Sequence, residues 1–222
     1  IAVRDAGPVA VFCDLLLERM EPGTIEYNDL KTIERQGLQC KSIVERLLSF
    51  ARISEEAEES CQINSCIESI VSVVKHTLDM NNIKLVQSLD DDIPLVRGDS
   101  RGFQQVFLNL INNSVYAMNG KGVLSIVTRR GTRVRDTAEI LIGDTGCGIK
   151  RQDLARIFDP FFTTKKVGEG TGLGLSVSYG IITKYGGTIE CESVRNDEAP
   201  GQSGTTFTIM LPFQAGGPSH SY

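Results

Sequence analysis

A glycine-rich run, Gly168-Glu169-Gly170-Thr171-Gly172-Leu173-Gly174-Leu175, leads directly into an amphipathic segment that predicts a helix over 174–185. Glycines let backbone N–H groups approach phosphate oxygens, and the N-terminus of a helix adds a favourable dipole. The run is not a Walker loop, because no Gly-Lys-Ser/Thr follows it, and it lacks the clear preceding strand of a dinucleotide-binding fingerprint. A flexible linker is the alternative, although Leu173 and Leu175 argue against a fully solvated spacer.

A second run with glycines, Asp144-Thr145-Gly146-Cys147-Gly148-Ile149, comes directly after a predicted strand at 138–142. A carboxylate at the bottom of a pocket can accept a hydrogen bond from an amine, while the glycine backbone passes close to a flat ring. The same pattern is also typical of a tight turn, so this run alone leaves both interpretations open.

Two asparagines four residues apart, Asn109 and Asn113, lie in a predicted helix over 100–118 that Asp99 and Ser100 can cap. This spacing places both amides on one face of the helix. Asparagine is a poor helix former, and its amide oxygen suits Mg²⁺ beside phosphate oxygens. Two solvated or hydrogen-bonded amides are the alternative.

The segment between the two glycine-containing runs is Ile157-Phe158-Asp159-Pro160-Phe161-Phe162-Thr163-Thr164-Lys165-Lys166. Its phenylalanines could dock a mobile flap on an apolar surface, or they could belong to the core. Lys165 and Lys166 could approach phosphates or remain solvated charges.

The N-terminal third predicts a helical hairpin. Apolar residues spaced by three and four predict a first helix that runs to Met20, a break at 21–24, and a second helix with a weak heptad seam from Leu30 to Ala51. Two such helices cannot bury their apolar faces alone, so we expect a second copy to complete a dimeric four-helix bundle. Packing against the rest of the same chain is the alternative.

Beyond a Glu-rich junction at 54–60, helical and strand periodicities alternate. Helices are predicted at 67–78, 100–118 and 174–185, and strands at 83–89, 123–128, 138–142, 188–193 and 205–211. The fold class is therefore α+β. We expect a helical hairpin over 1–57, a two-layer α/β sandwich over 58–213, and a disordered tail over 214–222.

Composition excludes several classes of protein. The 222 residues carry 23 basic and 28 acidic side chains, a net charge of -5, which argues against nucleic-acid binding through a basic face. No apolar run approaches the roughly 18 residues that a membrane span needs. The scattered cysteines argue against structural zinc and fit a reducing cytoplasm. Because Ile1 is not a natural start, we expect a fragment whose membrane or sensory segment lies upstream.

Four motifs in order resemble the N, G1, F and G2 boxes of sensor histidine kinases: Asn109/Asn113, Asp144-x-Gly146-x-Gly148, Phe158-Asp-Pro-Phe-Phe162 and Gly170-Thr-Gly-Leu-Gly174. Each motif alone is degenerate, but the ordered set is a strong signal. The similarity covers most of residues 61–213, and the hairpin resembles the family's dimerisation and phosphotransfer domain. The resemblance implies a Bergerat-type (GHKL) α/β sandwich that binds ATP and Mg²⁺, with a lid between the F and G2 boxes.

The resemblance also implies roles for individual residues. Asn113 would hold Mg²⁺, Asn109 would support the triphosphate site, and Asp144 would accept the adenine amine. The glycines of the G1 box would line the base, and those of the G2 box would wrap the phosphates. The positions implied for ATP binding are Asn109, Asn113, Asp144, Gly146, Gly148, Ile149, Phe158, Lys165, Gly170, Thr171, Gly172, Leu173, Gly174 and Thr205.

The chain departs from the family at the phosphate acceptor. The family's first helix carries His-Glu/Asp, followed a few residues later by Pro. With Pro8 taken as that proline, Val3 stands at the position of the phosphorylated histidine and Arg4 at that of its acidic neighbour. Valine has no nucleophile, so this copy could not accept phosphate there. An engineered substitution, a naturally degenerate kinase and a misplaced alignment are all compatible with the sequence.

The resemblance implies a cytoplasmic homodimer that transfers the γ-phosphoryl group of Mg-ATP to a histidine. The aspartate of a response-regulator receiver domain would receive the group next. The missing histidine motivates an alternative, a pseudokinase that binds nucleotide and signals through dimer geometry. Another GHKL ATPase, or a protein-serine kinase of the anti-sigma or mitochondrial dehydrogenase-kinase type, matches less of the chain.

Overall fold

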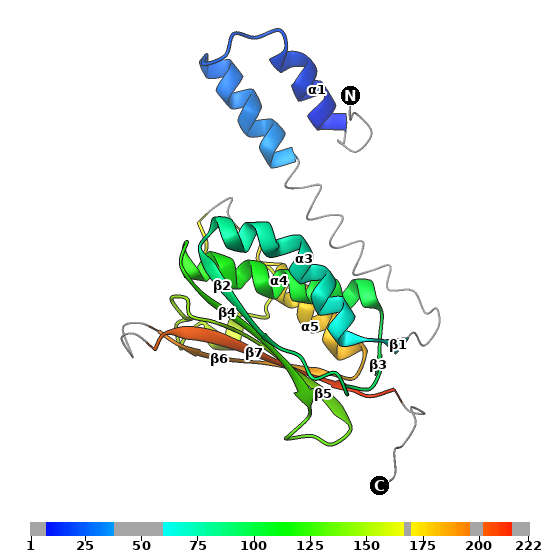
Figure 1. Ribbon diagram of the computed structural model, residues 1–222. Helices are drawn as coiled ribbons and strands as arrows, with labels where there is room; N and C mark the ends of the chain where they lie inside the picture. The colour runs from blue at the N-terminus through cyan, green and yellow to red at the C-terminus, as the bar shows by residue number, and fades with distance from the viewer. Residues whose placement is uncertain (1–7, 38–59, 167–169, 196–201, 215–222) are drawn as a thin grey trace. The chain divides into compact units, whose positions relative to one another are not determined.

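The computed structural model describes residues 8–37, 60–166, 170–195 and 202–214. The chain divides into two compact units, Ile1–Glu55 and Glu56–Tyr222, and each is described by itself (Figure 1). The predicted domain boundary after residue 57 lies outside the described residues.

The first unit contains α1 (Pro8–Leu17) and a second helix whose described part covers residues 25–37. α1 ends before the predicted Met20, because the chain turns there. Thr24 begins the second helix: its hydroxyl accepts a hydrogen bond from the backbone N–H of Tyr27 at 3.2 Å. The heptad positions beyond residue 37 lie outside the described residues.

Several large apolar side chains of the hairpin are exposed to solvent in the single chain. Phe12, Ile25 and Ile33 are 66%, 76% and 52% exposed, whereas Cys13 and Leu17 are buried. The described part of the hairpin therefore leaves large apolar side chains on its surface, available for a partner.

The second unit combines a sheet with helices. Its helices are α3 (Ile63–Met80), α4 (Ser100–Met118), α5 (Gly174–Lys184) and the short 3-10 helix η1 (Leu154–Arg156). The strands of the large sheet are β2 (Ile83–Ser88), β4 (Gly122–Arg130), β5 (Thr137–Asp144), β6 (Thr188–Val194) and β7 (Gly204–Pro212). Strands β1 (Ser60–Cys61) and β3 (Val96–Arg97) form a small second sheet. The helices and strands predicted between 67 and 211 are thus confirmed.

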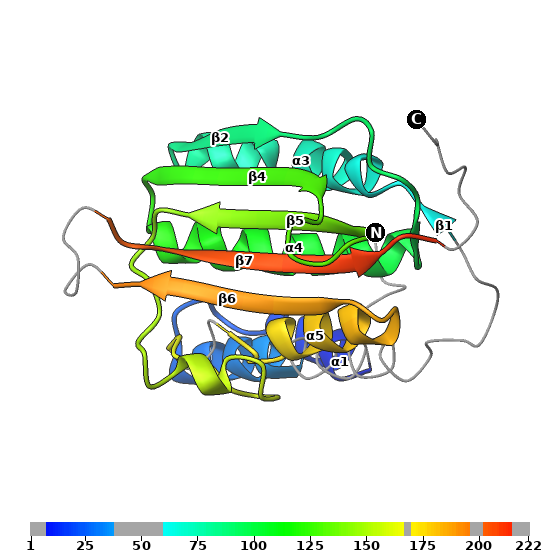
Figure 2. The same cartoon turned by 90° about the horizontal axis from the view of Figure 1, so that it is seen from below.

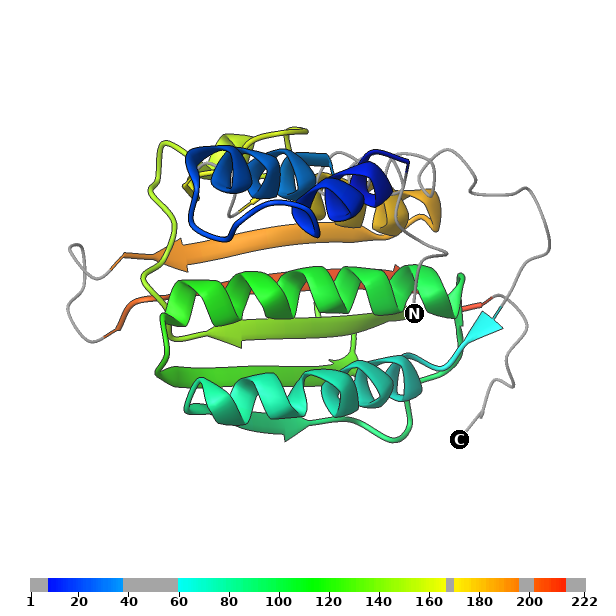
Figure 3. The ribbon, with the colours of Figure 1, turned by 90° about the horizontal axis from the view of Figure 1, so that it is seen from above.

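The large sheet has the strand order β2-β4-β5-β7-β6. Strand β2 runs parallel to β4, and the remaining neighbours are antiparallel (Figure 2). Helices α3, α4 and α5 lie on one face of this sheet (Figure 3). This arrangement is the two-layer α/β sandwich that the sequence predicted.

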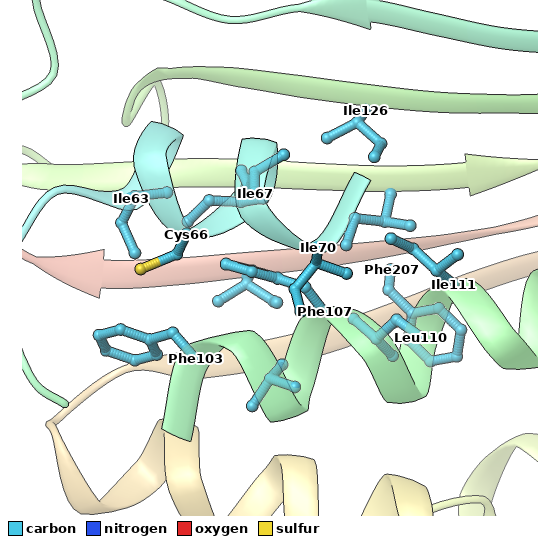
Figure 4. Close-up of a cluster of buried hydrophobic side chains, with 14 of the residues drawn as sticks. Ile63, Cys66, Ile67, Ile70, Phe103, Phe107, Leu110, Ile111, Ile126 and Phe207 are labelled. Atoms are coloured by element: carbon cyan, nitrogen blue, oxygen red, sulfur yellow. The ribbon is translucent and has the colours of Figure 1, made fainter. Parts of the chain in front are cut away.

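The core lies between the sheet and these helices. Ile63 and Ile67 of α3 meet Phe103, Phe107 and other apolar residues of α4 above the sheet, and all are almost fully buried (Figure 4). The spacing of apolar residues in each helix therefore determines which face packs against the sheet, and the opposite face carries the polar residues.

Local signals set the ends of α4. Asp99 caps its N-terminus by accepting hydrogen bonds from the N–H groups of Arg101 and Gly102, and Asn119 ends it in a left-handed conformation with φ of 46°. Gln214, the first residue of the predicted disordered tail, donates a backbone hydrogen bond to the carbonyl of Leu95 at 2.9 Å, and the rest of that tail lies outside the described residues.

Among the helices that the structure describes, none combines the length and the apolar character that crossing a bilayer requires.

Candidate functional site

Asp144 is the last residue of β5 and is only 9% exposed. Its carboxylate accepts a hydrogen bond from the N–H of Gly146 at 2.9 Å. Burial raises the pKa of Asp144, and hydrogen bonds from the N–H groups of Gly146 and Thr205 partly offset that rise. The sequence predicted Asp144 just after a strand, but β5 is longer than expected, and the residue pairs with Thr205 of β7.

Ser114 of α4 faces the same carboxylate. The Ser114 hydroxyl lies close enough to lower the pKa of Asp144. It nevertheless forms no well-aligned hydrogen bond with any described residue. The side chain is 1% exposed, and an unpaired buried hydroxyl is unfavourable. A water or a ligand group that reached the Ser114 hydroxyl would give it a hydrogen-bond partner.

The glycines after Asp144 are required by the protein's own packing. A Cβ at Gly146 would lie 2.7 Å from the Cβ of Ala117 in α4. Gly148 has φ of 73°, and a Cβ there would collide with the carbonyl oxygen of Val194 in β6. The G1 loop therefore passes tightly between α4 and the end of β6, and this constraint holds with or without a base beside it.

Asn109 ties α4 to α5. Its Nδ2 donates to the carbonyl of Gly174 at 3.0 Å and to the hydroxyl of Ser178 at 3.3 Å, and its Oδ1 accepts from Nε2 of Gln105 at 2.9 Å. Both ends of the amide are used, so Asn109 is placed to hold the start of α5 rather than to ligate a metal in this arrangement.

Asn113, one turn further along α4, accepts a hydrogen bond from a lysine ammonium. Nζ of Lys165 donates to Oδ1 of Asn113 at 3.1 Å, and the same ammonium lies 4.3 Å from the ring centroid of Tyr116. An amide oxygen that accepts from a cation is a hard donor of the type that Mg²⁺ uses. Among the described residues no group of three or more His, Cys, Asp or Glu side chains is arranged to hold a metal ion, so Mg²⁺ held here would take its other ligands from phosphate and water.

The phenylalanine segment docks on α5 and on the glycine-rich run. The ring of Phe158 lies 5.5 Å from that of Tyr179 in α5. Phe161 is 62% exposed and has φ of 66°, and a Cβ at Gly172 would collide with its backbone. The two segments therefore meet directly at Gly172, whose own φ of 67° also favours glycine.

The glycine-rich run leaves the N-terminus of α5 open. Leu173 occupies the capping position, and its apolar side chain cannot cap the N–H groups of the first turn. Thr171 accepts from the N–H of Leu173 at 3.4 Å, and Gly170 lies against the side chains of Lys165 and Thr163. An uncapped helix N-terminus beside a lysine is suited to phosphate oxygens.

Ile149 and Thr205 meet through a residue that the sequence analysis did not select. Ser193 of β6 accepts from the N–H of Ile149 at 2.8 Å and lies 2.9 Å from the hydroxyl of Thr205. Ser114 and Ser193 were both missed because serine is common on helices and strands. Adjacency to Asn113 was a signal that could have found Ser114, whereas Ser193 is recognised only through the pairing of β6 with β7.

The structure thus brings the described positions of the four predicted boxes to one side of the α/β unit, around α4 and the start of α5. Val3 and Arg4, which concern the phosphate acceptor, lie outside the described residues.

Comparison with known proteins agrees with this arrangement. Residues 98–215 match the family described as "Histidine kinase-, DNA gyrase B-, and HSP90-like ATPase". The chain is 33% identical to sensor kinase CckA of Brucella abortus over 90% of this chain and 22% of CckA. It is 31% identical to sensor histidine kinase ZraS of Escherichia coli K12 over 88% of this chain and 40% of ZraS. The chain therefore spans less than half the length of either relative.

Solved structures show the same fold. The catalytic domain of histidine kinase ThkA is similar with a TM-score of 0.60 and 26% identity, covering 71% of this chain and 96% of that domain. A structure of ThkA in complex with response regulator protein TrrA is similar with a TM-score of 0.66 at 20% identity, over 93% of this chain and 57% of that chain, and this likeness concerns the fold alone.

Proposed function

Because the chain belongs to the family of histidine kinase-, DNA gyrase B- and HSP90-like ATPases, we propose that it is the catalytic core of a two-component sensor histidine kinase. In this role it binds Mg-ATP and presents the γ-phosphoryl group to a histidine on a dimerisation helix. Since ATP is the phosphoryl donor, this activity belongs in the cytoplasm.

One observation carries the proposal. Asn113 and Ser114 are consecutive residues of α4. The amide oxygen of Asn113 accepts a hydrogen bond from the Lys165 ammonium, and the Ser114 hydroxyl faces the buried carboxylate of Asp144. Two adjacent residues thus connect an acceptor for a base amine with a site for the charge on a triphosphate. Neither group alone specifies a nucleotide, but their adjacency matches a ligand with a base at one end and phosphates at the other.

The side chains of the site have separable tasks. Asp144 accepts a hydrogen bond from the base, and Lys165 and the open N-terminus of α5 face the phosphates. Asn113 would hold Mg²⁺, which supplies neutralisation of phosphate charge when bound. Asn109 keeps α5 in register with α4, so that the glycine-rich run and the metal position stay together.

The acceptor position motivates a second candidate function. With Pro8 taken as the family's proline, Val3 stands at the position of the histidine, and valine cannot be phosphorylated. A chain with an intact nucleotide site and no acceptor is suited to act as a pseudokinase, or to phosphorylate a histidine on another chain.

The proposal is tested with γ-labelled ATP and two proteins, the unaltered chain and the variant Val3→His. The variant is expected to gain acid-labile, base-stable label, whereas the unaltered chain remains unlabelled. Label on the unaltered chain would show that the acceptor was misplaced. Nucleotide binding without label on either protein would favour the pseudokinase, and acid-stable label would indicate a serine or threonine kinase.

Two partners belong to this proposal. The exposed Phe12, Ile25 and Ile33 would pair with a second copy of the hairpin, and a response-regulator receiver domain would accept the phosphoryl group. Support comes from the curated relatives, which are sensor kinases, and from the apolar surface that the hairpin leaves open.

A further inference from the structure

Three polar residues form a row across neighbouring strands. Asp144 of β5 is directly opposite Thr205 of β7, and Thr205 is directly opposite Ser193 of β6. Directly paired residues of antiparallel strands point to the same face of a sheet. This face is the one covered by helices, because Ile142, two residues before Asp144, and Phe207, two residues after Thr205, belong to the core.

One order of protons satisfies all three hydrogen-bond contacts of the Ser193 hydroxyl. The Ser193 hydroxyl lies 2.9 Å from the carbonyl oxygen of Gly204, which can only accept, so Ser193 donates its single proton there. Ser193 also accepts from the N–H of Ile149 at 2.8 Å. The remaining contact, 2.9 Å to Oγ1 of Thr205, is then satisfied only if Thr205 donates to Ser193.

This order of protons determines what Thr205 can offer to a ligand. With its proton directed at Ser193, the Thr205 hydroxyl presents only lone pairs to any other neighbour. The adjacent Asp144 carboxylate is also an acceptor. A ligand group that meets this row must therefore donate, and a group that accepts meets unpaired lone pairs.

We infer that Ser193 is a positioning residue that makes the base pocket select a purine with an amino group at position 6 over a purine with an oxo group there. The inference rests on the proposed ATP site and adds to it a residue and a reason for base selectivity. Ser193 acts through Thr205: without the Ser193 oxygen, the Thr205 hydroxyl can rotate and donate to an oxo group.

The experiment measures dissociation constants of ATP and of ITP, its 6-oxo counterpart, by calorimetry with saturating Mg²⁺. The unaltered chain is expected to prefer ATP. Ser193→Ala should weaken ATP binding about threefold to tenfold and weaken ITP binding less, so that the ratio of the two constants falls at least about threefold. Ser193→Thr keeps a hydroxyl at this position, and the ratio should stay close to that of the unaltered chain.

Ser125→Ala is the matched control, because the Ser125 hydroxyl also bonds a strand carbonyl, that of Gly143 at 3.2 Å, on the opposite face of the sheet. It should leave the ratio unchanged. Thr205→Val provides a second test that does not depend on the folding of Ser193→Ala: it should lower the ratio, and combining it with Ser193→Ala should add little.

Equal weakening of ATP and ITP in Ser193→Ala would indicate a purely structural role and overturn the inference. So would an unaltered chain that binds both nucleotides equally. If the unaltered chain bound neither nucleotide, the proposed function itself would fail, which is a distinct result.

Discussion

The ammonium of Lys165 donates to the amide oxygen of Asn113 at 3.1 Å, on the oxygen that the family resemblance assigns to Mg²⁺. Binding of Mg-ATP through Asn113 therefore requires this contact to break. The aliphatic part of the Lys165 side chain lies next to Gly170, so an ammonium released from Asn113 would stay near the glycine-rich run, where phosphate oxygens are expected.

Replacing Lys165 tests whether its ammonium acts on the phosphates and not on the base of the nucleotide. Lys165→Met should weaken Mg-ATP binding about tenfold, since a charge-assisted hydrogen bond is lost, and should leave adenosine binding unchanged. Lys166→Met is the matched control, because Lys166 is exposed. Equal losses for ATP and adenosine in Lys165→Met would contradict a phosphate role.

Replacing the buried acid should separate nucleotide binding from stability. Burial raises the pKa of Asp144, so the native state binds its proton more tightly than the unfolded chain does. This group therefore lowers the free energy of unfolding as the pH rises from the ordinary carboxyl range through the raised pKa. Asp144→Asn should abolish ATP binding at neutral pH while leaving the melting temperature equal or higher, with this gain shrinking in acid. A lower melting temperature at neutral pH would contradict the assignment.

Much of the fold follows from sequence periodicity, and much of the site does not. The apolar period placed α4 and its two asparagines correctly, because one helix face packs on the sheet. The periodicity could not show β1 and β3, since two residues display no alternation. It also could not show that Asp144, Thr205 and Ser193 share a row, because strand register depends on pairing between segments far apart in the chain.

The glycine at position 172 should be required by its contact with Phe161. Gly172→Ala should weaken ATP binding and lower the free energy of unfolding by about 1–3 kcal/mol, because the new methyl group meets the Phe161 backbone in addition to the strain of a positive φ. Gly120→Ala is the matched control: its φ is 89°, but nothing lies within 4 Å of the added Cβ. Equal effects of the two substitutions on ATP binding would count against direct contact between these segments.

An ion pair between the buried Glu139 and the half-exposed Arg129 should make stability depend on pH in the sense opposite to that of Asp144. Glu139 is 1% exposed and accepts from Nε of Arg129 at 2.6 Å, which lowers the pKa of Glu139. The stabilisation is present above the ordinary carboxyl pKa and is lost as the pH falls through the lowered value.

Arg129→Ala should therefore reduce the free energy of unfolding at neutral pH by about 1–2 kcal/mol, less than for a fully buried pair because Arg129 is half exposed. The difference should shrink in acid, as measured by urea denaturation, and ATP affinity should not change. A difference independent of pH would show that packing, not charge, dominates there.

The most direct test of the central claim is calorimetric titration of the chain with Mg-ATP, beside the variants Asp144→Ala and Asn113→Ala. We expect saturable binding to the unaltered chain, no measurable binding to Asp144→Ala, and in Asn113→Ala the loss of the gain in affinity that Mg²⁺ provides. Absence of saturable binding to the unaltered chain, or binding that both substitutions leave intact, would contradict a nucleotide site built on these residues.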